Sequence, residues 1–97
     1  MNYTEEQIFI RAKKVLKDLQ QQYFKEENIE KAWFNDKDEV ARPRGTIMPT
    51  WTIAVNEPIF ETSEFLIFSD DTGEPLYYQN ANMIIHEIQK DDNGNYY

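Results

Sequence analysis

The sequence predicts an α+β fold in which one N-terminal amphipathic helix packs on an antiparallel meander sheet of four to five strands. Two observations lead to this prediction. Apolar residues recur at helical spacing over about residues 4–24, and from about residue 29 onward short apolar or alternating segments are separated by turn sequences. With 97 residues, the chain is long enough for one domain with one modest core, so we expect residues 1–97 to form a single unit.

The predicted helix has a clear beginning and a clear apolar face. Thr4 can cap the first turn, Gln7 follows three residues later, and Glu5 and Glu6 suit the positive end of the helix dipole. The apolar stripe consists of Ile8, Ala12, Val15, Leu16, Leu19 and Tyr23. The helix lysines lie largely off this stripe, which predicts that they face solvent.

Five segments are predicted as strands: about 29–34, 50–56, 64–69, 75–79 and 83–89. The second alternates most regularly, with Trp51, Ile53 and Val55 on one side. The last also fits a short helix, because Met83, Ile84 and Ile88 would then share a face.

Two segments between these strands are predicted as irregular. The sequence Asn35–Asp38 is typical of a turn, and the segment from Ala41 to Pro49 contains two prolines and a glycine, which favours a loop.

The strands at 64–69 and 83–89 carry apolar side chains on both sides, although one helix covers only one face of a sheet. Either the sheet curls over a second small core, or its open face meets a partner or a second copy of the chain. Of these, we expect the partner or the second copy.

The net charge of -8 is confined to the second half of the chain. Residues 1–44 carry nine acids and nine bases, whereas residues 45–97 carry nine acids and one base. Such a field repels nucleic acid and attracts basic proteins, and the alternative is that the acidity only keeps the protein soluble. The N-terminal charge order does not suit a signal peptide and no apolar run suits a membrane span, so we expect no membrane association. The absence of cysteine agrees with a cytoplasmic location.

The segment Phe68–Asn80 contains Asp71-Thr72-Gly73, the tripeptide that carries the catalytic carboxylate of aspartic proteases. Here Glu74 and Pro75 follow where a small residue is typical, and the later apolar-apolar-glycine segment of those enzymes is missing. The spacing of a calcium-binding EF-hand loop also fails from Asp70 onward. Turn residues between two apolar strands predict a hairpin loop instead.

Other chemistry has little support in the sequence. His86 is the only histidine, there is no cysteine to join it, and the three glycines are isolated. We therefore predict no enzyme activity, no metal and no cofactor.

The layout of helix, WTIAV strand, FLIFSDDTGEPLYY hairpin and terminal DNGNYY resembles PepSY-like domains over about residues 5–90. In size, acidity and compactness, the chain is similar to small bacterial immunity proteins of polymorphic or contact-delivered toxin systems. The residues that carry the resemblance are Trp51 and Asp70–Glu74. The immunity resemblance implies that the protein binds and blocks a cognate toxin in the cytoplasm of the producing cell.

Charge and resemblance together predict an acidic inhibitor of a cognate protein toxin with a basic surface, such as a nuclease. The residues predicted to bind this partner are Glu57, Glu61, Glu64, Asp70, Asp71, Glu74, Tyr77 and Tyr78. Carboxylates would steer the encounter, and tyrosines would supply contact area. The alternative is a homodimeric, non-enzymatic accessory domain with a PepSY-like fold.

Overall fold

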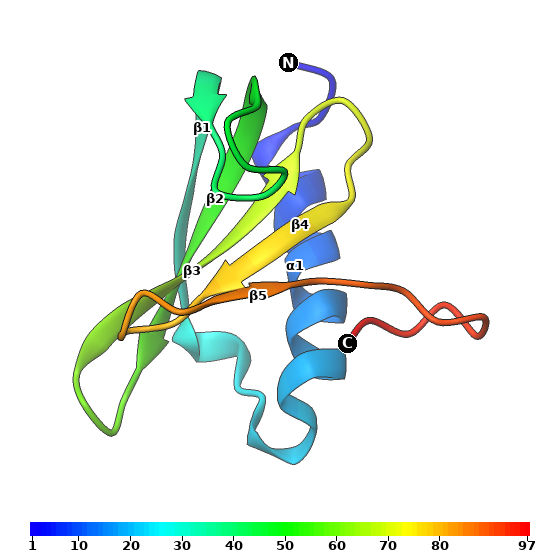
Figure 1. The fold of residues 1–97 in the computed structure, drawn as a ribbon. Helices are drawn as coiled ribbons and strands as arrows, with labels where there is room; N and C mark the ends of the chain where they lie inside the picture. Colours follow the sequence, from blue (N-terminus) through cyan, green and yellow to red (C-terminus); the bar gives the residue numbers. More distant parts are fainter.

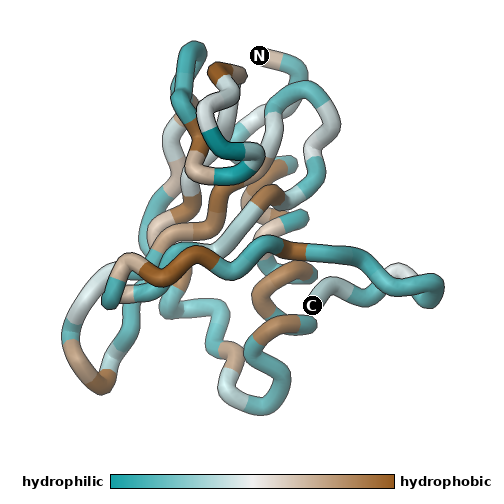
Figure 2. Tube along the Cα trace, in the orientation of Figure 1, coloured by the Kyte–Doolittle hydropathy of each residue, from teal (hydrophilic) through white to brown (hydrophobic).

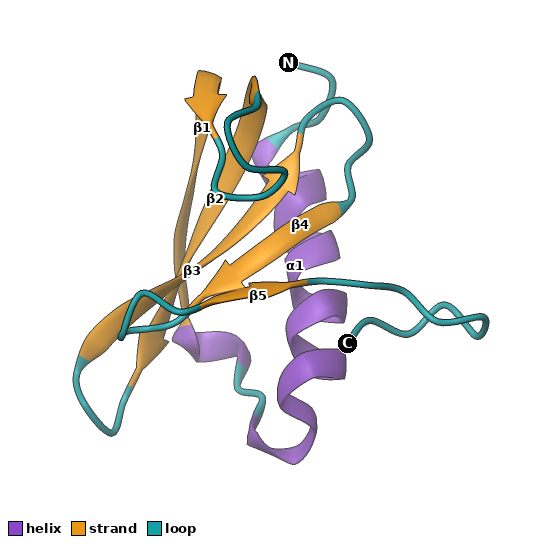
Figure 3. Cartoon of the chain, in the orientation of Figure 1, coloured by secondary structure: helices purple, strands orange, loops and turns teal.

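The structure, a computed structural model, describes residues 1–97 and has one helical layer against one sheet (Figures 1 and 3). Helix α1 (Glu5–Gln20) packs on a five-stranded antiparallel sheet with strand order β1-β2-β3-β4-β5. The strands are β1 (Ile29–Glu39), β2 (Ile47–Glu57), β3 (Thr62–Ser69), β4 (Pro75–Gln79) and β5 (Ile85–Glu87). The α+β meander predicted from the sequence is confirmed.

Helix α1 begins with the predicted cap. The backbone N–H of Gln7 donates to Thr4 Oγ1 (3.2 Å), and the backbone N–H of Thr4 donates to Gln7 Oε1 (2.9 Å). The helix ends at Gln20, earlier than predicted, because Gln21 has a φ of 52° and short 3-10 turns follow at Gln21–Tyr23 and Glu26–Asn28. No helix is long and apolar enough to cross a membrane.

The main core lies between α1 and one face of the sheet. Its buried residues are Ile8, Ala12, Val15, Leu16, Trp51, Ile53, Val55, Leu66 and Phe68. The helix stripe and the alternation of β2 predicted this face, since both patterns place their apolar residues on one side.

A second, smaller core covers part of the other sheet face, as in the first of the two alternatives that the sequence left open. Val40, Ile67 and Tyr77 are buried there, with Phe65 and Ile85 among the partly buried residues around them. Val40 and Ala41, which follow β1, pack over this face, so part of the apolar surplus of β3 is buried within the protein.

The turn predicted at Asn35–Asp38 is wrong, because β1 continues through these residues to Glu39. β1 is an edge strand, so its polar side chains can face solvent without breaking the sheet. The pairing with β2 shifts register between Asn35 and Asp38. Pro49 lies opposite this irregularity, where its missing N–H interrupts no regular ladder, and this allows β2 to begin inside the predicted loop.

The segment predicted as a strand or a helix at 83–89 forms only the short strand Ile85–Glu87. Met83 has a φ of 63° and belongs, with Ile84, to the connection from β4. Beyond β5 the chain forms a C-terminal hairpin in which Lys90 bridges to Tyr96.

Candidate protein-binding surface

The carboxylates predicted to bind a partner lie at opposite ends of β3, whereas Tyr77 and Tyr78 lie in β4, opposite the middle of β3 (Figure 1). One group is in the loop between β3 and β4, which we call the DTG loop (Asp70–Glu74). The other group lies where the β2–β3 connection (residues 58–61), with Glu57 and Glu64 on the adjoining strands, meets the β4–β5 connection (residues 80–84). We call these segments together the hairpin end. The predicted residues therefore form two separate groups rather than one continuous patch.

The DTG loop is the tight hairpin connection that its sequence predicts. The backbone N–H of Ser69 donates to the carbonyl of Glu74 (2.9 Å), and the N–H of Gly73 donates to the carbonyl of Ser69 (2.8 Å). Gly73 has a φ of 71°, a conformation that favours glycine.

Asp70 is buried, with 2% of its surface exposed, which corrects its predicted position on the contact surface. Its carboxylate accepts hydrogen bonds from the backbone N–H groups of Asn2 (2.8 Å) and Tyr3 (3.2 Å) and from the indole of Trp51 (3.0 Å). Burial raises the pKa of Asp70, but the bonds from Asn2, Trp51 and Tyr3 and the N-terminal charge outweigh it, so the pKa lies below its usual value. Asp70 therefore holds the N-terminus in place.

The rest of the DTG loop also makes contacts within the protein. The Tyr3 hydroxyl donates to the carbonyl of Thr72 (3.0 Å), and Arg11 Nη1 donates to the carbonyl of Gly73 (2.9 Å). Glu74 accepts from the Tyr96 hydroxyl (2.6 Å) and pairs with Lys90. These bonds join the N-terminal segment, α1 and the C-terminal hairpin.

The two tyrosines predicted to bind the partner differ in their burial. Tyr77 is 5% exposed and belongs to the second core, where its hydroxyl accepts from the backbone N–H of Ala41 (3.2 Å). This burial corrects its predicted place on the contact surface. Tyr78 is half-buried and donates to Glu64 (2.7 Å).

Of the DTG-loop carboxylates, Asp71 is exposed and has no side-chain hydrogen bond.

The hairpin end exposes four large apolar side chains on two loops. Ile59 and Phe60, between β2 and β3, are 80% and 74% exposed, while Met83 and Ile84, between β4 and β5, are 74% and 62% exposed. Figure 2 shows the hydrophobic colour of both connections. Sequence reasoning missed these residues, although adjacent apolar residues inside turn segments are an available signal, since turns that only connect strands are usually polar.

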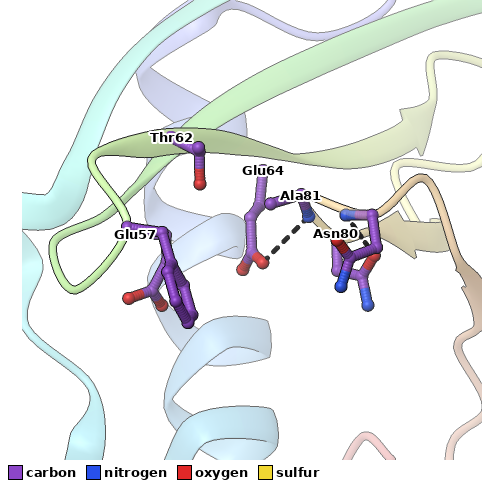
Figure 4. Close-up of a pocket in the computed structure, with 7 residues that line it drawn as sticks. Glu57, Thr62, Glu64, Asn80 and Ala81 are labelled. Atoms are coloured by element: carbon purple, nitrogen blue, oxygen red, sulfur yellow. Dashed lines mark hydrogen bonds between the residues drawn. The ribbon is translucent and has the colours of Figure 1, made fainter.

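Carboxylates surround these apolar residues in fixed positions. Glu57 accepts from the backbone N–H of Ile59 (2.8 Å). Glu64 accepts from the backbone N–H of Ala81 (3.1 Å), as Figure 4 shows, and also from the Tyr78 hydroxyl. Glu61 is exposed. The three ion pairs of the protein lie elsewhere, so these glutamates are uncompensated in the sense that none of them forms an ion pair with a base of the chain.

Glu64 also fixes the ionisation state of its neighbour. Burial raises the pKa of Tyr78, and the hydrogen bond to Glu64 and the charges of Glu64 and Glu57 raise it further. Tyr78 is therefore a neutral donor at any physiological pH, and it orients the Glu64 carboxylate.

A hollow of about 310 Å³ separates the two loops and is lined by Glu57, Phe60, Thr62, Glu64, Asn80, Ala81 and Asn82 (Figure 4). This hollow has acidic, amide and apolar walls and no base. Such walls suit a cationic or apolar side chain of a binding partner.

His86 is exposed on β5, and no three His, Cys, Asp or Glu side chains gather into a group that could hold a metal ion. Comparison of the chain with protein-family models, curated proteins and solved structures found no match. The geometry of the hairpin end is thus the basis for any assignment of function.

Proposed function

We propose that the protein is an acidic protein-binding inhibitor, an immunity protein that binds and neutralises a cognate bacterial toxin with a basic surface in the cytoplasm of the producing cell. The observation that supports this proposal is the hairpin end, where four exposed apolar side chains stand among uncompensated glutamates. No other part of the protein combines the two features on adjacent loops.

Each feature has a distinct role in binding. Apolar side chains at the centre of an interface supply most of the affinity, and burying one large side chain contributes about 1.5–3 kcal/mol. Uncompensated carboxylates accelerate the encounter with a basic surface and discriminate against acidic partners. An inhibitor needs both, because it must find its toxin quickly and release it slowly.

The experiment is co-expression with the product of the adjacent gene, followed by binding of the purified proteins. We expect the protein to rescue cells that express the toxin, and affinity to fall at least about tenfold when salt is raised from about 50 to 500 mM. Lack of rescue and lack of binding would refute the proposal. Rescue by a protein whose binding does not respond to salt would refute the role of charge.

The homodimer predicted as an alternative has lost part of its motivation, since the second core covers part of the surplus apolar face. Light scattering of the isolated protein tests it directly. A stable dimer that dissociates when toxin is added would place self-association at the same surface.

A further inference from the structure

We infer that the β2–β3 connection is the inserting element of the inhibitor, and that its tip, Ile59–Phe60, enters an apolar cleft with a basic rim on the partner. This inference rests on the proposed function and specifies the chemistry of its partner. The inference assigns different roles to the two loops of the hairpin end, because they differ in charge and in how far they project from the protein.

The tip is apolar at its centre and acidic on both sides. Glu57 precedes Ile59 and Phe60, and Glu61 follows them. The β4–β5 connection exposes Met83 and Ile84 but contains no charged residue between Asn80 and Ile84. Only the β2–β3 tip therefore matches a cleft that is both apolar inside and basic at its rim.

The conformation of the tip is held by contacts within the protein. Glu57 pairs with Thr62 at its base, and the Glu57 side chain accepts the N–H of Ile59 (2.8 Å). Pro58 restricts the backbone between them. A preorganised loop loses less conformational entropy on binding than a mobile one, so its exposed apolar area contributes more to affinity.

The tip projects from the surface between two hollows. Glu57 lines the hollow of about 310 Å³ shared with the β4–β5 connection and a second hollow of about 520 Å³ beside the end of α1, where Tyr23, Pro58 and Ile59 are also found. Figure 1 shows the β2–β3 connection extending beyond the sheet. A convex element flanked by hollows fits a concave partner whose rim enters them. The hollow of about 310 Å³ has no base in its walls and suits a basic rim, whereas Lys25 lines the other hollow.

The test measures binding to the purified product of the adjacent gene, made as an inactive variant, by surface plasmon resonance. We expect the double variant Ile59→Ser/Phe60→Ser to bind at least about 100-fold more weakly, mainly through faster dissociation. We expect Glu57→Gln/Glu61→Gln to associate about tenfold more slowly at low salt and nearly normally at high salt. The side-chain carbonyl of the glutamine that replaces Glu57 can still accept the N–H of Ile59, so this variant tests charge rather than loop shape.

Two matched variants serve as controls. Met83→Ser/Ile84→Ser removes two similarly exposed apolar side chains from the neighbouring loop, and Glu87→Gln/Asp92→Asn removes two exposed charges elsewhere. Met83→Ser/Ile84→Ser should weaken binding clearly less than Ile59→Ser/Phe60→Ser, because its loop lacks flanking acids, and Glu87→Gln/Asp92→Asn should bind within about threefold of the wild type. Thermal melting checks that every variant is folded.

The outcomes distinguish the inference from the proposed function. No binding by the wild type would overturn both. If the wild type binds and Ile59→Ser/Phe60→Ser binds equally well, the insertion of the β2–β3 tip is refuted but the proposed function is not. The same conclusion holds if Met83→Ser/Ile84→Ser weakens binding as much as Ile59→Ser/Phe60→Ser does. If the isolated protein forms a dimer that Ile59→Ser/Phe60→Ser abolishes, the tip binds a second copy of the chain. This result would also overturn the inference.

Discussion

The indole Nε1 of Trp51 donates a 3.0 Å hydrogen bond to Oδ1 of Asp70, and both residues are buried. Trp51 belongs to the main core through β2, and Asp70 begins the DTG loop. Because the same carboxylate accepts two backbone N–H groups of the N-terminal segment, this pair connects the sheet, the loop and the start of the chain. Substitution of either residue should therefore destabilise the sheet, the DTG loop and the N-terminal segment together.

Asp70→Asn should destabilise the fold by about 2–4 kcal/mol, because it replaces a buried anion that accepts three hydrogen bonds with an amide that must present N–H groups to N–H donors. Urea unfolding measures this free energy. Trp51→Phe, which leaves both backbone donors in place, should cost less than Asp70→Asn. A double-mutant cycle should give a coupling energy of at least about 1 kcal/mol, and additive effects would contradict the importance of the pair.

Acid should unfold the protein partly through Asp70. Its folded-state pKa lies below the unfolded value of about 3.9, so its contribution to stability is present above that value and is lost as pH falls through the folded pKa. The pKa of Asp18 is lowered as well: partial burial raises it, and bonds from Lys14 and the Tyr96 backbone outweigh that effect. As the pH drops below about 5, we expect the free energy of unfolding to decrease in the wild type and to decrease less steeply in Asp70→Asn.

Gly73→Ala and Gly45→Ala form a matched pair. Both glycines have positive φ, 71° and 80°, so either alanine adds backbone strain of about 1–2 kcal/mol. A Cβ at Gly73 would also collide with the Tyr3 ring, whereas a Cβ at Gly45 would have no neighbour within 4 Å. Thermal unfolding should therefore show a clearly larger loss for Gly73→Ala, and equal losses would refute the packing of Tyr3 on this loop.

Tyr78→Phe should lower the free energy of unfolding by about 1–2 kcal/mol, because Glu64 loses a donor at a half-buried position. The pKa of Tyr78 is raised in the folded state, so the stability contributed by its neutral form is present below the unfolded pKa of about 10 and is lost as pH rises toward the folded value. The wild type should lose more stability than Tyr78→Phe between about pH 9 and 11. Parallel pH curves for the two proteins would contradict this assignment.

Charge reversal in the DTG loop should separate structural from exposed carboxylates. Asp71→Lys should change the free energy of unfolding by no more than about 0.5 kcal/mol, because the side chain is exposed and free of hydrogen bonds. Asp70→Lys should prevent folding, since it buries a cation among N–H donors. Circular dichroism and urea titration measure both, and a strongly destabilised Asp71→Lys would show that the loop tolerates no change.

Several elements could be predicted because their signals are local. The capping residues Thr4 and Gln7, the stripe that begins at Ile8, and the alternation around Trp51 each reflect a period or a bond within a few residues. β4 was predicted with the bounds that the structure shows. The polar run at Asn35–Asp38 was misread because a turn and an exposed edge strand favour the same residues, and only pairing with β2 distinguishes them.

The candidate site was less predictable, since the sequence does not show which carboxylates are used inside the fold. Asp70 and Asp71 are neighbours with the same side chain, yet one is buried by the N-terminal segment and the other is exposed. The difference is due to hydrogen bonds between Asp70 and residues that are more than sixty positions away in the sequence.

The sequence by itself determined the α+β class, the strand order of a meander, the hairpin nature of Asp71-Thr72-Gly73 and the acidity of the second half. The tertiary structure alone decided that the DTG loop holds the chain ends together and that Ile59, Phe60, Met83 and Ile84 gather at the hairpin end. The physical reason is that secondary structure follows from short-range periods, whereas exposure depends on which distant segments cover a residue.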